Sequence, residues 1–200
     1  MIVIGLIGPI AAGKSIVLDE FRRHGAATIE ADAVSRELLK PGSALLGDVI
    51  AEFGEDYLDE AGRLRRGRLA ALIFADESAR RRLERLVHPA MTERMSAEIE
   101  QLRGAEVNPP PVVVLEAANL IEMGALPLVD ITVLVTAPRN VRLERLMQRD
   151  NLSREEAEER LRLHEELGIE RFGADYSIDT QLTEAETRRQ VELIWQAAVK

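Results

Sequence analysis

Residues 2–15 read Ile2-Val3-Ile4-Gly5-Leu6-Ile7-Gly8-Pro9-Ile10-Ala11-Ala12-Gly13-Lys14-Ser15. The first six are apolar and largely β-branched, which predicts a buried strand. The rest has the spacing G-x-x-x-x-G-K-[ST], in which successive backbone N–H groups surround an anion. Apolar residues at helical spacing follow from position 16, so we expect a strand, a phosphate loop and a helix in succession.

The loop predicts specific roles for two side chains. Lys14 is expected to reach the β- and γ-phosphates of a nucleotide, and the Ser15 hydroxyl is expected to bind Mg²⁺. The helix that begins here adds the positive end of its dipole. Lysine occurs only at positions 14, 40 and 200 in a chain rich in arginine, which indicates that a compact ammonium is required at Lys14. The alternative is a glycine-rich turn that only joins a strand to a helix.

Length and composition exclude several classes of protein. With 200 residues, of which 46% are hydrophobic, the chain suits one domain with an insertion. The net charge of -9 argues against a general nucleic-acid binder, and the absence of cysteine excludes disulfides and thiolate sites. The apolar start lacks the basic region of a signal peptide, and no apolar stretch approaches the ~20 residues that span a bilayer. We therefore expect a soluble, cytoplasmic protein without membrane or nucleic-acid partners.

Further strands are predicted at residues 26–29, 112–116, 131–135 and 175–179. From about residue 38 to 104 helical patterns replace them, at 45–53, 68–74, 77–87 and 90–102. The last two helices are separated at His88-Pro89, because proline is disfavoured inside a helix and suits the first turn of a new one. An insertion of this kind is where a small-molecule kinase would hold its acceptor.

Acidic residues follow two of the predicted strands. In a parallel sheet the carboxyl ends of the strands line the ligand crevice, so Asp32 is a candidate for the chemistry. Alternatively, Asp32 only caps a helix that begins near Ala33. Glu116 ends the third strand as a metal-associated carboxylate would, and Glu122 follows it as a possible support of the site.

Basic residues form two groups. Arginines surround Gly67 at positions 63–68, and the alternative to an acceptor site there is a solvated face. His88, taken alone, is more often a packed or capping histidine. In the predicted helix from residue 139, Arg142, Arg145 and Arg149 lie within about 60° of one another, which suits nucleotide phosphates. The alternative is pairing with Glu144, Asp150 or the acidic run at 155–159.

The chain resembles the dephospho-CoA kinases over nearly its whole length. The motifs shared in order and at similar spacing are the phosphate loop, the acidic-Ala-Asp at 30–32, Lys40-Pro41-Gly42, Leu86-Val87-His88-Pro89, Arg145-Leu-Met-Gln-Arg149-Asp150, and Ala174-Asp175-Tyr176 to Ile178-Asp179. The chain departs from the family pattern at Glu30, at Ile16, at residues 118–122, at His164 where glutamine is common, and at Thr180 where asparagine is usual.

The resemblance implies transfer of the γ-phosphoryl group of ATP to the ribose 3′-hydroxyl of dephospho-CoA, the final step of coenzyme A synthesis, with ATP and Mg²⁺ as cofactors. It also implies a P-loop kinase-type, three-layer α/β fold with a five-stranded parallel sheet, a helical substrate-binding insertion and a lid. We place these in one domain of residues 1–200, with the core at about 1–37, 105–138 and 174–200, the substrate region at 38–104 and the lid at 139–173.

By position, the resemblance assigns Asp32 as the base and Arg145, with Lys14, as the groups that neutralise the charge of the transferring phosphoryl. The predicted ATP-binding residues are Gly8, Ala11, Ala12, Gly13, Lys14, Ser15, Ile16, Arg142 and Arg149. The acceptor candidates are Arg65, His88 and Glu122, and the metal candidates are Ser15 and Glu116.

Three other readings are open. Another small-molecule P-loop kinase, for a nucleoside, a nucleotide or shikimate, would share the loop and differ in the insertion. A regulatory GTPase would need an Asn/Thr-Lys-x-Asp motif, which the three lysines of this chain do not supply. An inactive nucleotide-binding scaffold is disfavoured by the intact Lys14, Ser15 and Asp32. A monomer or a small homo-oligomer is expected.

Overall fold

The computed structural model describes residues 1–165, 168–169 and 172–200. The chain divides into two compact units: Met1–Ile29 with Gln101–Lys200, and Glu30–Glu100. The predicted substrate region, 38–104, falls mostly in the second unit. The predicted lid, 139–173, falls in the first, and its residues 166, 167, 170 and 171 lie outside the described part.

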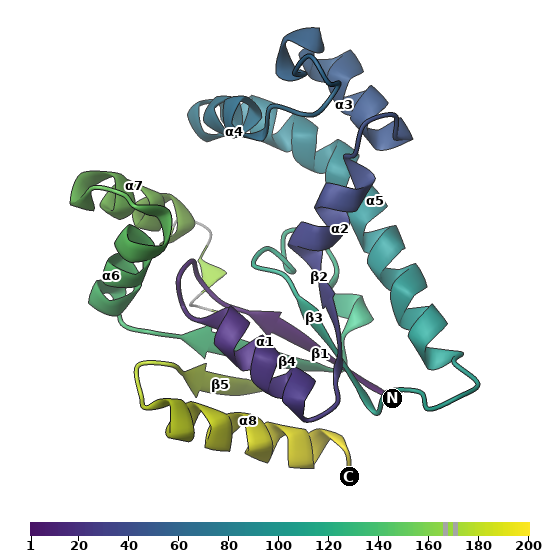
Figure 1. The fold of residues 1–200 in the computed structure, drawn as a ribbon, viewed down its shortest axis with the longest axis vertical. Coiled ribbons are helices and arrows are strands. Elements are labelled where there is room, and N and C mark those ends of the chain that lie inside the picture. The colour runs from purple at the N-terminus through teal and green to yellow at the C-terminus, as the bar shows by residue number, and fades with distance from the viewer. Residues whose placement is uncertain (166–167, 170–171) are drawn as a thin grey trace. The chain divides into compact units, whose positions relative to one another are not determined.

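A five-stranded parallel sheet forms the centre of the first unit (Figure 1). Its strands are β1 (Ile2–Ile7), β2 (Ala27–Glu30), β3 (Val112–Glu116), β4 (Ile131–Thr136) and β5 (Tyr176–Asp179), in the order β2-β3-β1-β4-β5. The predicted α/β class with its parallel sheet is therefore confirmed, with strand ends within one residue of the expected positions.

The register of the strands aligns their carboxyl ends at one edge of the sheet. Leu6 of β1 pairs with Glu116 of β3, and Ile7 pairs with Leu134 of β4. Farther along, Thr136 of β4 pairs with Asp179 of β5. The loop that leaves β1 at Gly8 therefore starts between the ends of β3 and β4.

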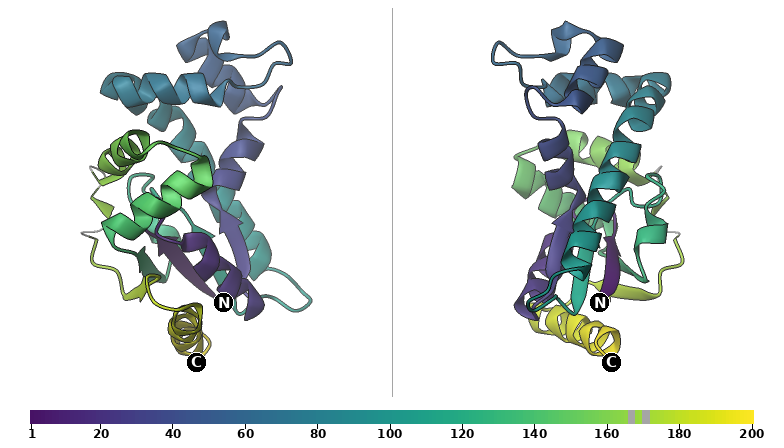
Figure 2. Two further views of the ribbon diagram at one scale, coloured as in Figure 1. Left: turned by 60° about the vertical axis from the view of Figure 1, so that its left-hand side comes forward. Right: turned by 90° about the vertical axis from the view of Figure 1, so that its right-hand side faces the viewer.

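Helices of the first unit form two pairs. Helices α1 (Lys14–Arg23) and α8 (Glu184–Ala198) lie side by side against the sheet (Figure 1). Helices α6 (Arg139–Asp150) and α7 (Arg154–Glu165) pack on each other beyond β4 (Figure 2). The short helix η2 (Leu126–Leu128) precedes β4. Thr183 and Glu186 form a capping box at α8, and Ser153 with Glu156 forms one at α7.

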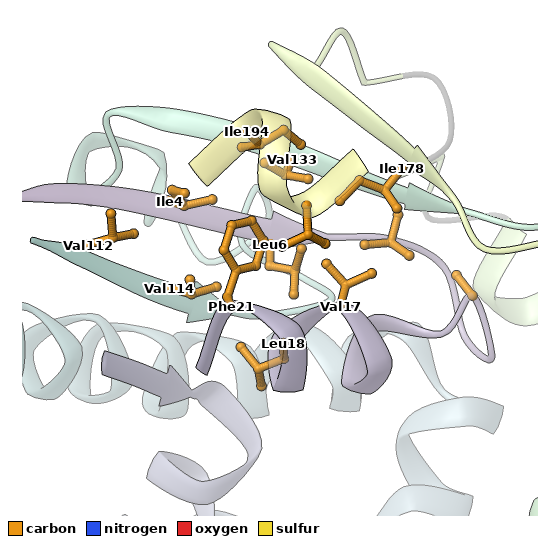
Figure 3. Close-up of a cluster of buried hydrophobic side chains, with 13 residues drawn as sticks. Ile4, Leu6, Val17, Leu18, Phe21, Val112, Val114, Val133, Ile178 and Ile194 are labelled. Carbon is orange, nitrogen blue, oxygen red and sulfur yellow. The ribbon is translucent and has the colours of Figure 1, made fainter. Parts of the chain in front are cut away.

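The hydrophobic core lies between one face of the sheet and helices α1 and α8 (Figure 3). Alternate strand residues such as Ile4 and Leu6 point to this face, because successive side chains of a strand face opposite sides. Phe21 of α1 is fully buried among them. Trp195 of α8 is partly buried, packs against this core and stacks on His24 with ring centroids 5.6 Å apart.

The second unit is helical. It contains α2 (Ala31–Leu38), α3 (Ala44–Phe53), the short helix η1 (Glu55–Tyr57), α4 (Arg66–Ala75) and α5 (Glu77–Arg103), whose last residues enter the first unit. Asp32 lies inside the first turn of α2, and Glu30 is the residue at its N-cap. The alternative in which Asp32 only caps a helix starting near Ala33 is therefore wrong.

The predicted break at His88-Pro89 is also wrong, since α5 continues through Pro89 as one long helix (Figure 2). Proline removes one hydrogen bond and costs ~3 kcal/mol inside a helix. The same helix buries Val87, Met91, Met95 and Ile99 at four-residue spacing. This apolar stripe runs across the proline and maintains the helix, while Pro89 itself stays on the exposed side.

A carboxylate fixes the start of β4. The Asp175 carboxylate accepts hydrogen bonds from the Thr132 N–H (2.8 Å) and the Thr132 hydroxyl (2.7 Å). These bonds hold the pKa of Asp175 below its usual value, because they stabilise the charged form. The folded protein therefore gains stability from Asp175 above the unfolded-state pKa of about 3.9 and loses it as the pH falls through the lower folded-state pKa.

We accordingly expect Asp175→Asn to melt at a lower temperature than the wild type at pH 7, with a difference that narrows as the pH falls below about 4. Thermal unfolding followed by circular dichroism at pH 7 and at pH 3.5 measures this. Asp19→Asn, which removes an exposed ion pair with Arg22, is the matched control and should differ little from wild type at either pH. Equal melting temperatures of Asp175→Asn and wild type at pH 7 would contradict the assignment.

Candidate active site

The start of the phosphate loop packs closely against the end of β4. A Cβ atom on Gly8 would lie 2.4 Å from the Val135 carbonyl oxygen, so only glycine fits there. Ala11 and Gly13 both have left-handed backbone conformations, with φ of 58° and 92°. Left-handed backbone at a non-glycine residue is a strained arrangement that is concentrated at ligand-binding sites.

Helix α1 begins directly from this loop. Gly13 is its N-cap residue; no side chain caps this end, and its first turn contains no acidic residue. The positive end of the helix dipole is therefore not compensated by a neighbouring carboxylate of its own first turn. Such a helix end, following a strand and a glycine loop, is suited to binding an anion.

Lys14 lies over the loop next to a carboxylate. Its ammonium donates to the Gly8 carbonyl (2.9 Å) and to the Pro9 carbonyl (3.4 Å). It is also 3.9 Å from the Glu116 carboxylate, and both side chains are mostly buried. The pairing of Leu6 with Glu116 places this carboxylate beside the loop, so the structure brings the predicted phosphate-binding lysine and the predicted metal carboxylate together.

The residues predicted to hold a metal offer oxygen atoms. Ser15 is exposed in the first turn of α1, and Glu116 ends β3. In the described part of the chain no group of three or more His, Cys, Asp or Glu side chains could hold a metal ion by itself. Mg²⁺ is typically bound by one or two protein oxygens together with nucleotide phosphates and water, so this donor set fits Mg²⁺.

Arg145 approaches the same loop from α6. Its guanidinium donates to Thr180 at the hydroxyl (2.9 Å) and at the carbonyl (2.7 Å). Longer contacts of 3.5 and 3.4 Å reach the carbonyls of Ala11 and Ala12. Among the described residues its acceptors are hydroxyl and carbonyl oxygens, so its positive charge is not cancelled by any of their carboxylates.

The other two arginines of the predicted stripe are paired. Arg142 is buried, and its guanidinium donates to the Ala137 carbonyl (3.2 Å) and to Glu165 (3.2 Å) of α7. Arg149 binds Asp150 through two hydrogen bonds of 2.8 and 3.0 Å, which lower the pKa of that carboxyl. Pairing with Asp150 was one expected alternative, whereas Glu165 was not foreseen. Contacts of Arg142 and Arg149 with a nucleotide stay predictions.

His164 belongs to the same charged environment. Burial, together with the positive charges of Lys14, Arg142, Arg149 and Arg160, holds the pKa of His164 below its usual value. Its Nδ1 atom is buried and has no hydrogen-bond partner among the described residues. The histidine is therefore neutral at pH 7 and adds no charge to a region that already contains four cations.

The acceptor candidates are distributed over both units. Glu122 is exposed in the turn after β3 in the first unit, whereas Asp32, Arg65 and His88 belong to the second. Asp32 is exposed in α2, and His88 is half-buried in α5. The Arg65 Nε atom donates to the Leu58 carbonyl (2.6 Å). That these residues face the phosphate loop stays a prediction.

Some of the arginines around Gly67 lie on a solvated face, which was the alternative to an acceptor site. Arg63 and Arg68 form ion pairs with Asp59 and Asp56 at exposed positions, which is the usual arrangement of a charge run. Two remaining loop residues differ in exposure: Ala12 is buried, and Ile16 is 48% exposed.

Comparison with known proteins decides between the open readings. A family model described as dephospho-CoA kinase matches residues 2–186. The chain belongs to the dephospho-CoA kinase family. The activity predicted from the sequence, phosphorylation of dephospho-CoA as the final step of coenzyme A synthesis, is the activity of this family.

Individual relatives agree with the family over their whole length. The chain is 40% identical over 195 residues to a dephospho-CoA kinase of Geobacter sulfurreducens, covering 98% of each. It is 42% identical over 196 residues to one of Moorella thermoacetica, covering 98% of this chain and 92% of that protein. A crystal structure of a Thermus thermophilus protein superimposes with a TM-score of 0.79 at 30% identity, covering 100% of this chain and 98% of the other.

Thr180 and His164 are two residues near the phosphate loop or its cations to which sequence reasoning assigned no site role. Both appear in the sequence only as departures from the family pattern. Thr180 bonds to Ala12, 168 positions away in the sequence, and the charges around His164 come from several segments, so no local signal could identify either residue.

Because a Cβ at Gly8 meets backbone rather than a flexible side chain, we expect Gly8→Ala to reduce the free energy of unfolding by about 1–3 kcal/mol. ATP binding should weaken with it, since relief of the clash must move the loop or β4. Chemical denaturation and calorimetric titration with ATP measure the two effects.

The matched control is Gly47→Ala in α3, where nothing lies within 4 Å of the added Cβ and the backbone is helical. This change should stabilise the protein slightly, by about 0.5–1 kcal/mol. A denaturation midpoint of Gly8→Ala equal to that of the wild type would show that the loop is not confined as described.

Proposed function

We propose that this kinase performs its phosphoryl transfer at the phosphate loop, with Lys14 and Arg145 neutralising the charge of the transferring group. The observation that carries the proposal is that two cations from different helices contact the same short loop. Lys14 of α1 binds carbonyls at its start, and Arg145 of α6 contacts carbonyls at its middle. A phosphate seated on the N–H side of this loop lies within the field of both.

Phosphoryl transfer mainly requires positive charge near the transferring group and correct positioning of the reactants. The transferring phosphoryl passes through a loose transition state whose charge is spread over its oxygens, so preorganised cations supply most of the catalysis. Arg145 has no carboxylate partner among the described residues and keeps its full charge for this purpose. Lys14, in contrast, is 3.9 Å from the Glu116 carboxylate. When ATP binds, its phosphates replace part of this interaction with Glu116.

Ser15 and Glu116 are the residues that would hold Mg²⁺, together with the nucleotide phosphates. Bound there, the ion would neutralise phosphate charge and orient the phosphates for transfer. The proximity of Glu116 to Lys14 supports this assignment, because both then lie beside the same phosphates. Gly8, Ala11, Ala12, Gly13 and Ile16 complete the proposed ATP loop, with Arg142 and Arg149 as further nucleotide contacts.

For the acceptor we propose Asp32 as the group that accepts or orients the proton of the 3′-hydroxyl. Asp32 follows the carboxyl end of β2, a strand of the parallel sheet, and such ends line the ligand site. Arg65, His88 and Glu122 are proposed acceptor contacts. In this proposal residues 38–104 hold the acceptor and residues 139–173 form a lid within one domain of residues 1–200.

The cellular setting is proposed on similar grounds. None of the helices in the described part combines the length and the apolar character needed to cross a bilayer. Cytoplasmic location, a monomer or small homo-oligomer, and the lack of a nucleic-acid partner are proposed from the cysteine-free, acidic composition and the small-molecule chemistry.

The direct test is to incubate the protein with ATP, Mg²⁺ and a panel of alcohols that contains dephospho-CoA, a nucleoside, a nucleotide and shikimate. We expect phosphorylation of dephospho-CoA at the 3′-hydroxyl, identified by mass spectrometry with fragmentation, and loss of product when EDTA removes the metal. Preferential phosphorylation of another acceptor would overturn the assignment.

The two proposed catalytic groups can be ranked. A transition-state arginine is worth about 10³–10⁵-fold in turnover and a positioned base about 10²–10⁴-fold. We therefore expect Arg145→Ala to reduce kcat at saturating substrates at least as much as Asp32→Asn does. Arg154→Ala, which removes an exposed arginine paired with Glu158 in α7, should retain nearly normal kcat. Near-normal turnover of Arg145→Ala would remove Arg145 from the transition state.

A further inference from the structure

Thr180 joins three parts of the first unit immediately after β5. It is 4% exposed, and its N–H donates to the Thr136 carbonyl (3.0 Å) at the end of β4. Its hydroxyl donates to the Ala12 carbonyl of the phosphate loop (2.6 Å). The same hydroxyl accepts from Arg145, and so does the Thr180 carbonyl, at 2.9 and 2.7 Å. One buried residue thus connects the sheet edge, the loop and α6.

The hydroxyl uses both of its hydrogen-bonding functions here. A hydroxyl has one proton to donate and two lone pairs to accept with. Its proton goes to Ala12, which is closer than the alternative acceptor on Thr136 at 3.3 Å. A lone pair receives the Arg145 N–H. The loop carbonyl and the guanidinium are therefore linked through a single oxygen atom.

The loop itself leaves space for this linkage. A Cβ on Gly13 would lie 3.0 Å from the Thr180 hydroxyl and 3.3 Å from the Arg145 guanidinium. These separations are shorter than ordinary van der Waals contact, so the last glycine of the loop packs directly under the two side chains. Their position is consequently coupled to the conformation of the loop.

The chemical nature of the anchor matters as much as its geometry. Arg142 and Arg149 are held by the carboxylates of Glu165 and Asp150, which cancel their charge. Thr180 holds Arg145 with neutral oxygens. A neutral anchor fixes the direction of a guanidinium while leaving its positive charge available to an incoming phosphoryl group.

We propose that Thr180 is a positioning residue for phosphoryl transfer: through its hydroxyl it sets Arg145 and the phosphate loop in one arrangement. The inference rests on the proposed role of Arg145. It assigns a function to a buried residue just after β5 that lies between the phosphate loop and α6.

The first experiment separates turnover from binding. Thr180→Val keeps the shape of the side chain and removes the hydroxyl, so we expect kcat to fall about 10- to 100-fold, the value of a hydrogen bond to a charged group. The KM for ATP should change less than about threefold, because Lys14 and the loop still bind the nucleotide. Thr180→Ser restores the hydroxyl and should return kcat to within about threefold of the wild type.

Thr187→Val is the matched control, because Thr187 is equally buried, at 3% exposed, but lies in α8. It should leave kcat nearly unchanged and so separates a specific effect from the general loss of a buried hydroxyl. Each variant is assayed below its own melting temperature. If Thr180→Val does not fold, Thr180→Ala replaces it in every comparison.

A double-mutant cycle then tests the route of the effect. If Thr180 acts through Arg145, adding Thr180→Val to Arg145→Ala should lower kcat by less than about threefold further. Two results would overturn the inference: normal kcat in Thr180→Val, or an undiminished effect of Thr180→Val in the Arg145→Ala background. Normal turnover of Arg145→Ala alone would instead refute the proposed function of Arg145, so the two failures are distinguishable.

Discussion

The backbone of the phosphate loop imposes the central constraint on this site. A loop that turns its N–H groups toward an anion must turn carbonyl groups the other way, and those carbonyls need donors of their own. Here the donors are side chains to which we assign functions. Lys14 binds the carbonyls of Gly8 and Pro9, and Thr180 and Arg145 approach those of Ala11 and Ala12. Two of these donors, Lys14 and Arg145, are also the groups that we assign to the phosphates.

Charge is distributed unevenly over α6 and α7, and the difference follows from the partner of each arginine. Carboxylates bind the other two arginines of the predicted stripe: Arg142 pairs with Glu165 of α7, and Arg149 pairs with Asp150 of its own helix. Arg145 has uncharged partners among the described residues. One turn of helix separates Arg145 from each of the others, yet only Arg145 faces the loop with its charge uncancelled. Burial and this positive surrounding also keep His164 neutral, since protonation would add a further like charge.

Local patterns were sufficient to predict most of the elements. The predicted strand ends were within one residue of the observed ones, because the apolar runs end at or near glycine, proline or acidic residues. The errors occurred where a longer-range force exceeds a local one. Pro89 predicts a helix end, but the buried stripe through Val87 and Met91 continues across it and outweighs one lost hydrogen bond. For Asp32, the alternative role as a helix cap is excluded because α2 begins at Ala31 directly from β2.

The sequence alone determined the phosphate loop, the parallel α/β architecture and the family, because these depend on spacing along the chain: a G-x-x-x-x-G-K-S motif, apolar runs and their order. Only the tertiary structure decided which arginine of the stripe keeps its charge and which residue anchors it. Those facts depend on pairs such as Thr180 with Ala12 and Arg142 with Glu165, which helix periodicity cannot specify. The physical reason is that hydrogen bonds and ion pairs act over a few ångströms in space, and folding brings distant segments within that range.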